Sequence, residues 1–236
     1  MGLYTRREAA TIASCFSMLA IPFSVVLADI AGIMDYYVLY YMASIAIVLI
    51  LAMILSRIPP LSSIENSYHN GIDNSPEEID ESEPMLARAS SAALKRAKDG
   101  PDFSDYFSIA LRDLVGMWAN ILPPVLTFAT IAMVVVEYTS FFQIIATPFV
   151  PLVEVLGLDS AVDTTTAVIT GVADPLFPVL IGAEIPSDVN RVAIAIMGLI
   201  QLIFMTETGV VLMKSPIGFK LRHLATLFVL RLVLGF

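Results

Sequence analysis

Four polar side chains lie within an apolar stretch that is long enough to cross a lipid bilayer. The stretch runs from Val192 to Met213, and its polar members near the middle are Gln201, Thr206, Glu207 and Thr208. Lipid cannot solvate a carboxylate, so an ionisable residue at this depth is a functional-site hypothesis by default. Inside a helix bundle, Glu207 can take up a proton, pair with a cation or accept a hydrogen bond from a solute.

These side chains also have structural interpretations. Glu207 can instead be the ion-pair partner of Arg231 or of Lys214, which lies seven residues later on the same helical face. Both interpretations of Glu207 stay open. Gln201 and Thr208 are also seven residues apart on one face, and a hydrogen-bonded bridge between helices is the favoured role of that pair.

A second group of candidate residues lies where helix-breaking residues interrupt apolar sequence. Asp174 precedes Pro175, so it is either a ligand at a helix break or a turn former, and we favour the ligand. Thr165 and Thr166 can offer hydroxyls to sodium or a solute, whereas Thr164 suits a helix cap. Near the N-terminus, Ser14 and Ser17 are binding candidates, with small-residue packing as the alternative.

Composition narrows the class of protein. Hydrophobic residues make up 57% of the 236 residues, and the mean hydropathy of +0.81 is typical of a membrane protein. The single cysteine, Cys15, and the two distant histidines, His69 and His223, predict no disulfide framework, no metal site and no redox cofactor. Much of the acidity lies in one polar segment, so the net charge of −9 does not indicate a charged partner, and we expect no nucleic-acid binding.

The chain divides into three parts. Residues 1–55 hold a broken helix or hairpin at residues 8–31, which contain Pro22, and a transmembrane helix at residues 36–55. A cleaved secretory signal is the competing interpretation of the N-terminus. Residues 56–102 form a polar, water-facing loop with a short helix at residues 84–98.

Residues 103–236 form a membrane domain that begins with an interfacial helix at residues 103–118. Adjacent prolines, Pro123 and Pro124, are expected to kink or interrupt the next apolar run. Residues 159–186 are expected to form two half-helices, with Asp163 and Thr164–Thr166 as caps of the first. The last apolar run, residues 223–236, contains Arg231. Positive charge flanking the first hairpin predicts that the N-terminus and the polar loop are cytoplasmic.

Three motifs together resemble one known family. They are Thr5-Arg6-Arg7-Glu8-Ala9-Ala10-Thr11-Ile12-Ala13 with Phe16-Ser17, Arg57-Ile58-Pro59-Pro60-Leu61-Ser62, and Gln201-Leu202-Ile203-Phe204-Met205-Thr206-Glu207-Thr208-Gly209. The chain resembles the nucleoside-recognition, or Gate-domain, membrane proteins, and specifically their YjiH-like branch. The resemblance implies a transport-type architecture, with "nucleoside" as a family label. Longer relatives carry further membrane helices before the segment that begins here at Thr5, which implies a second small membrane subunit.

The sequence therefore predicts an all-α, polytopic helical membrane protein with broken or re-entrant helices. We expect a carrier subunit in a bacterial or archaeal cytoplasmic (inner) membrane that moves a small solute with Na⁺ or H⁺ as coupling ion and catalyses no reaction. Its expected partners are membrane lipid and either a second small membrane protein or further copies of itself. The alternative is a non-transporting scaffold or regulatory subunit. A carrier needs a water-accessible cavity at Glu207 and Asp174, whereas a scaffold needs those side chains satisfied by protein.

Overall fold

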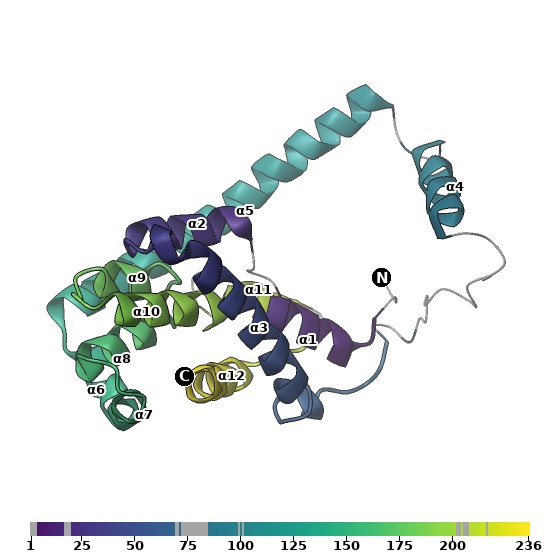
Figure 1. Cartoon of the computed structure of the whole chain (residues 1–236). Coiled ribbons are helices and arrows are strands. Elements are labelled where there is room, and N and C mark those ends of the chain that lie inside the picture. The colour runs from purple at the N-terminus through teal and green to yellow at the C-terminus, as the bar shows by residue number, and fades with distance from the viewer. Residues whose placement is uncertain are drawn as a thin grey trace.

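The computed structural model is all-helical, and no strand occurs among the residues that it describes (Figure 1). Those residues are 4–16, 20–68, 71, 85–98, 100, 102–201, 204, 208–215 and 217–236. The predicted all-α class is confirmed for these ranges.

The N-terminal part contains two short helices followed by one long helix. α1 (Arg6–Phe16) starts with a capping box, in which Thr5 Oγ1 accepts from Glu8 N–H at 3.3 Å and Glu8 Oε2 accepts from Thr5 N–H at 2.9 Å. Ala20 is extended, with φ −77° and ψ 124°, so α2 (Ile21–Ile30) begins as a separate helix. Pro22 lies in its first turn, where the missing proline N–H costs no hydrogen bond.

The long helix α3 (Tyr37–Leu55) follows a 3-10 turn, η1 (Met34–Tyr36). One of its faces is buried in the bundle and carries Tyr40, Ser44, Val48, Leu51 and Leu55. The opposite side exposes large apolar side chains, and Val38 and Leu39 are 72% and 64% exposed. An apolar surface of this kind marks a membrane or protein contact.

Two segments are long and apolar enough to cross a membrane. They are residues Arg6–Ile30, which pass through residues outside the described ranges, and Met34–Leu55. By length and composition the predicted span at residues 36–55 therefore has the dimensions of a membrane-crossing helix.

The middle of the chain contains α4 (Met85–Lys98) and the 36-residue α5 (Phe103–Tyr138). The expected helix at residues 84–98 is present, but the interruption at Pro123 and Pro124 is not, because α5 continues through both residues. Each proline removes only its own N–H donor, so the helix lacks the two hydrogen bonds that would reach the carbonyls of Ala119 and Asn120. At 1.5 Å per residue, α5 is about 54 Å long.

Short helices follow in α6 (Phe141–Ala146), α7 (Val150–Val155), α8 (Ala161–Thr170) and α9 (Phe177–Gly182). The two half-helices expected within residues 159–186 are α8 and α9. The expected caps of α8 are wrong: the helix starts at Ala161, so Asp163 and Thr164–Thr166 lie inside it. Ser160 has a left-handed backbone, φ 49°, which turns the chain into the helix before the threonines are reached.

The C-terminal part consists of α10 (Asp188–Gln201), α11 (Thr208–Lys214) and α12 (Leu221–Gly235). We expected one helix through Val192–Met213, and this is wrong, because α10 ends at Gln201 and Phe204 is not helical. A distant residue supplies a physical reason, since Arg231 bonds to the carbonyls of Ile200 and Gln201 and so gives two of the last carbonyls of α10 a partner outside the helix. The seven-residue face argument for Gln201 and Thr208 fails with the helix.

The helix α10 packs against α3, α8, α9 and α12 and so forms the centre of the bundle (Figure 1). Its start lies at the η1 end, where Tyr36 Oη donates to Asp188 at 3.4 Å. The start of α1 lies at the opposite end of α3, where Arg6 N–H donates to Ser67 O at 3.0 Å. We call these the η1 end and the Ser67 end; α1 runs inward from the latter and α10 from the former.

Contacts along α10 place the α8–α9 pair. Near the start of α10, Asn190 bonds to Thr164 of α8, and further on Gly182 of α9 lies against Ile194. The turn between α8 and α9 contacts α10 furthest from its start, since a Cβ at Gly198 would lie 3.5 Å from Pro175 O. The pair therefore begins at the η1 end, turns beside Gly198 and returns to the η1 end.

Candidate functional site

Arg231 of α12 is the largest fully buried side chain, with 1% of its surface exposed. Its guanidinium donates to Ile200 O at 2.7 Å and Gln201 O at 3.4 Å, both at the end of α10. The other terminal nitrogen donates to Ser14 O, near the end of α1, and lies 3.3 Å from Cys15 Sγ. One side chain thus joins the inner ends of two helices.

The electrostatics of this junction are set by helix ends. The last carbonyls of a helix have no partner within it, and together they carry roughly half a negative charge. Two such ends meet at Arg231, so they offer roughly one negative charge to one guanidinium. These carbonyls therefore stabilise the positive charge of the buried Arg231 side chain.

Three buried nitrogen and oxygen atoms at the junction remain without hydrogen bonds. They are Oε1 and Nε2 of Gln201 and Nε of Arg231, and none of them has a partner in the described part of the chain. Gln201 is 2% exposed. Leaving such groups unpaired costs about 1–3 kcal/mol each, so natural proteins keep them mainly where a ligand, water or another group completes the bonding.

The predicted residues around Gln201 divide into described and undescribed ones. Thr208 is buried and begins α11, beyond the break in the helix. Ser14 is buried too, and it reaches Arg231 through its carbonyl; its hydroxyl donates to Thr11 O at 3.4 Å. Glu207, Thr206 and Ser17 lie outside the described residues, although the sequence places them next to these helix ends.

The predicted residues of α8 and the following turn are satisfied within the chain. Thr165 and Thr166 donate to Ala161 O and Val162 O at 2.6 and 2.7 Å. Asp174 Oδ1 accepts from Leu176 N–H at 2.9 Å, which gives Asp174 the turn-forming role that we considered less favoured. Because the Pro175 carbonyl lies beside Gly198, this turn is one helical turn away from Gln201.

Two residues that matter structurally were missed or undervalued from sequence. Asn190 is 1% exposed; its amide donates to Thr164 Oγ1 at 2.8 Å and also to Asp159 O, and so ties α10 to the start of α8. Arg231 was considered only as a partner of Glu207. A lone arginine within an apolar C-terminal run was the available signal.

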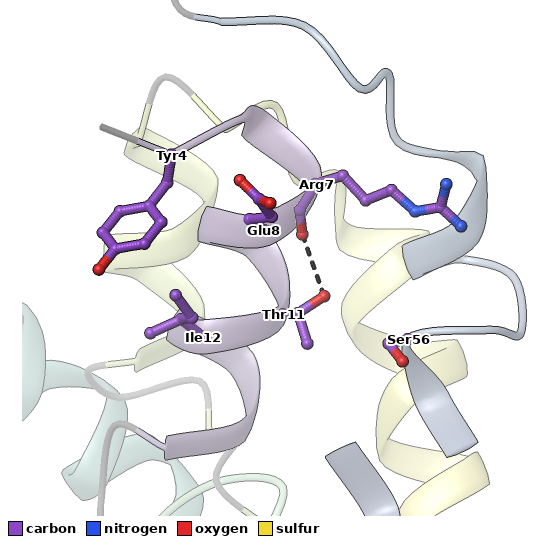
Figure 2. A pocket seen from close by; sticks show the side chains of 6 residues that line it. All are labelled: Tyr4, Arg7, Glu8, Thr11, Ile12 and Ser56. Carbon is purple, nitrogen blue, oxygen red and sulfur yellow. Dashed lines mark hydrogen bonds between the residues drawn. The ribbon is translucent and has the colours of Figure 1, made fainter. Parts of the chain in front are cut away.

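Of the surface pockets found along the described residues, two lie at opposite ends of the bundle and away from the junction. One, of about 420 Å³, lies at the Ser67 end between Tyr4, Arg7, Glu8, Thr11, Ile12 and Ser56. Figure 2 shows Tyr4 and Ile12 on one side, the Arg7 side chain pointing away from them, and the Thr11 hydroxyl bonded to Arg7 O at 3.0 Å. The other, of about 350 Å³, lies at the mouth of the α8–α9 pair and is more polar, with Thr166, Asp163 and Glu184 among its lining residues.

Among the residues that the structure describes, no group of three or more His, Cys, Asp or Glu side chains could hold a metal ion.

Comparison with known proteins gives one informative match. The chain is 34% identical over 234 residues to an uncharacterized protein of Alkalihalophilus pseudofirmus. The aligned region covers 99% of this chain and 50% of that protein, so the chain spans about half the length of its relative. No protein-family model and no solved structure matches the chain.

Proposed function

We propose that the chain is a transport-type subunit of an integral membrane protein, in which interrupted helices hold a polar junction inside the bilayer. The observation that carries the proposal is the meeting of α1 and α10 at Arg231, next to the Gln201 amide, which has no hydrogen-bond partner among the residues that the structure describes. Interrupted helices whose ends face a shared interior point are how many carriers hold a solute near the midplane.

The membrane setting is supported by the outer surface of α3. Its exposed side carries Val38, Leu39, Met42, Leu49, Ile50 and Met53. Contact with lipid would avoid the unfavourable free energy of exposing these apolar side chains to water. The Ser67 end carries Arg6, Arg7 and Arg57, whereas at the η1 end Arg191 is paired with Asp188. This distribution favours a cytoplasmic Ser67 end in a bacterial or archaeal inner membrane.

The proposal takes up the resemblance to the Gate-domain, YjiH-like membrane proteins. On this basis the chain moves a small, uncharged or weakly charged solute by alternating access, with a second small membrane subunit or further copies of itself as partner. The turn beside Gly198 would gate the junction from the η1 end, and α1 would gate it from the Ser67 end. No covalent bond is made or broken in this scheme.

A scaffold role is the second candidate, and a specific observation favours it. Asp174, Thr165 and Thr166 find their hydrogen bonds within the chain, as a scaffold requires. Gln201 favours the carrier, since its buried amide has no partner in the described ranges.

A ligand screen followed by uptake tests the carrier. Thermal unfolding of the purified protein in mild detergent is measured with panels of nucleosides, amino acids and sugars, and beside it that of Gln201→Leu and Gln143→Leu. The second variant makes the same chemical change at an exposed position of α6. We expect a solute that stabilises the wild type and Gln143→Leu but not Gln201→Leu, and that enters vesicles containing the wild type. Uptake no faster than into empty vesicles, for every stabilising solute, would contradict transport.

Co-purification tests the partner. The tagged chain is extracted from its native membrane in mild detergent, and the proteins that accompany it are identified by mass spectrometry. A second small membrane protein in fixed stoichiometry supports the two-subunit carrier. A single chain, or copies of this chain alone, would reject the second subunit and place the site within or between identical subunits.

A further inference from the structure

We propose that the Arg231 guanidinium is a cation built into the chain, which occupies the position of a bound monovalent ion where α1 and α10 end. Among the residues that the structure describes, each group that the guanidinium contacts is a ligand of the kind that holds small cations. Three are backbone carbonyls, those of Ser14, Ile200 and Gln201, and the fourth contact is the Cys15 sulfur at 3.3 Å. In many carriers, carbonyls at the ends of half-helices coordinate sodium ions in this way.

Charge and geometry favour a guanidinium at this point. The two helix ends supply roughly one negative charge, which one monovalent cation neutralises. Sodium would need further oxygen ligands around it, whereas the planar guanidinium reaches one helix end with each of its two terminal nitrogens and is less strongly hydrated than a compact ion. It also stays charged throughout the physiological pH range.

The packing of α12 against α10 holds the Arg231 guanidinium in place between the helix ends. Leu227, Phe228 and Leu232 of the same helix are buried beside it, and a Cβ at Gly235 would lie within 3.1 Å of atoms of Ile200 and Met197 on α10. The helix therefore lies tightly against α10, and the guanidinium is fixed between the helix ends. Its consequence for coupling rests on the proposed function: such a carrier needs no sodium at this junction.

If the Arg231 guanidinium takes the place of a bound cation, its removal should make the thermal stability of the protein depend on a free cation. Thermal unfolding midpoints are compared in sodium, potassium and choline chloride, with and without low millimolar methylguanidinium, for the wild type, Arg231→Met and Arg231→Lys. Arg222→Met, an exposed position on the same helix, is the control. We expect Arg231→Met to unfold about 10 °C lower, because it leaves buried carbonyls without their cation. Methylguanidinium or sodium should recover part of this loss.

The wild type and the two variants that keep a positive charge at residue 231 serve as controls. The wild type, Arg222→Met and Arg231→Lys, which retain a charge at residue 231, should show no preference for sodium over choline. An Arg231→Met protein that responds to none of the cations would overturn the proposal, because a purely packing role of the arginine predicts that result. A wild type that is stabilised by sodium over choline at this junction would overturn it as well.

A measurement on the unmodified chain keeps the proposal testable if Arg231→Met does not fold. Cys15 is the single cysteine and is fully buried beside the guanidinium, so the rate of its reaction with a maleimide reports opening of this junction. The rate in wild-type protein should be the same in sodium, potassium and choline chloride. Slower labelling in sodium alone would show an ion at the junction and overturn the proposal. Neither readout requires transport, so failure of the uptake assay and failure of this inference are separate results.

Discussion

At the scale of single residues, Arg231 and Gln201 are buried side by side and yet differ in how their hydrogen-bonding groups are satisfied. The terminal nitrogens of Arg231 have carbonyl partners on two helices. The amide of Gln201 has none among the residues described. A buried amide kept without partners weakens the fold, so its retention is better explained by binding than by stability.

Gln201→Leu should therefore stabilise the protein. The substitution removes two unpaired polar atoms at similar volume, and we expect a gain of about 1–3 kcal/mol in the free energy of unfolding. Denaturant unfolding in detergent measures it, with Gln143→Leu as the exposed control and an expected change near zero. A loss of stability in Gln201→Leu would show that the amide has partners and is structural.

Substitution of Asn190 should instead lower the free energy of unfolding. Its amide bonds both to Thr164 Oγ1 and to Asp159 O, so Asn190→Leu should cost about 1–3 kcal/mol. A double-mutant cycle with Thr164→Val should give a coupling energy of roughly 1 kcal/mol, since the two residues share one hydrogen bond. Strictly additive effects would contradict the bond between them.

At the scale of helices, sequence reasoning succeeded where the pattern was local. The helix at residues 84–98, the helix at residues 36–55 and the two short helices within residues 159–186 follow from apolar runs and from breakers such as Pro175 and Gly182. It failed where a distant residue decides the outcome. The end of α10 at Gln201 is bonded by Arg231, thirty residues later, and no pattern within residues 192–213 reveals that contact.

The continuity of α5 rules out one of the two outcomes expected at Pro123 and Pro124. The helix is not interrupted there, because it loses only the N–H donors of the two prolines and keeps its other hydrogen bonds. The candidate site was predicted only in part. Gln201 and Ser14 were named from the sequence. Their meeting at Arg231 was not, because it depends on three helices that are far apart in the sequence.

The contact between α9 and α10 gives a prediction at this scale. A Cβ at Gly182 would lie 2.8 Å from Ile194 Cδ1 and 3.0 Å from Cγ2, so the two helices pack closely here. Gly182→Val should lower the free energy of unfolding by roughly 1–3 kcal/mol through overpacking. Adding Ile194→Ala should make the double variant more stable than the sum of the two single effects, because each change accommodates the other. Additive losses in thermal unfolding would show that the contact is not made.

The start of α12 depends on pH through His223. Burial first, and then the charges of Arg222 and Lys220, lower the pKa of His223, whose neutral Nδ1 accepts from Lys220 N–H at 3.3 Å. Since the folded protein binds this proton less well than the unfolded chain, the contribution is complete above the ordinary pKa of histidine. It is lost as the pH falls through the lowered pKa. The unfolding midpoint should fall more steeply with acid in the wild type than in His223→Gln; equal slopes would contradict the assignment.

At the scale of the whole molecule, the helix directions predict which ends of the chain share a side of the membrane. Both ends of the α8–α9 pair lie at the η1 end, together with Asp35, and opposite Ser63. Single cysteines at Ser160, Glu184, Asp35 and Ser63, in a Cys15→Ser background, can be tested with an impermeant maleimide on intact cells. The first three should be labelled from outside, and Ser63 only after permeabilisation. Labelling of Ser160 and Glu184 from opposite sides would show that residues 159–186 cross the membrane.

The meeting of α1 and α10 inside the membrane is the central claim, and a crosslink in native membranes tests it most directly. Cys15 and a cysteine placed at residue 201 are treated with a short bifunctional thiol reagent, and the joined peptides are identified by mass spectrometry. A cysteine at residue 143, in α6, is the control. We expect an intramolecular crosslink from Cys15 to residue 201 and none to residue 143. A crosslink to neither position, or to both equally, would contradict the junction at Arg231.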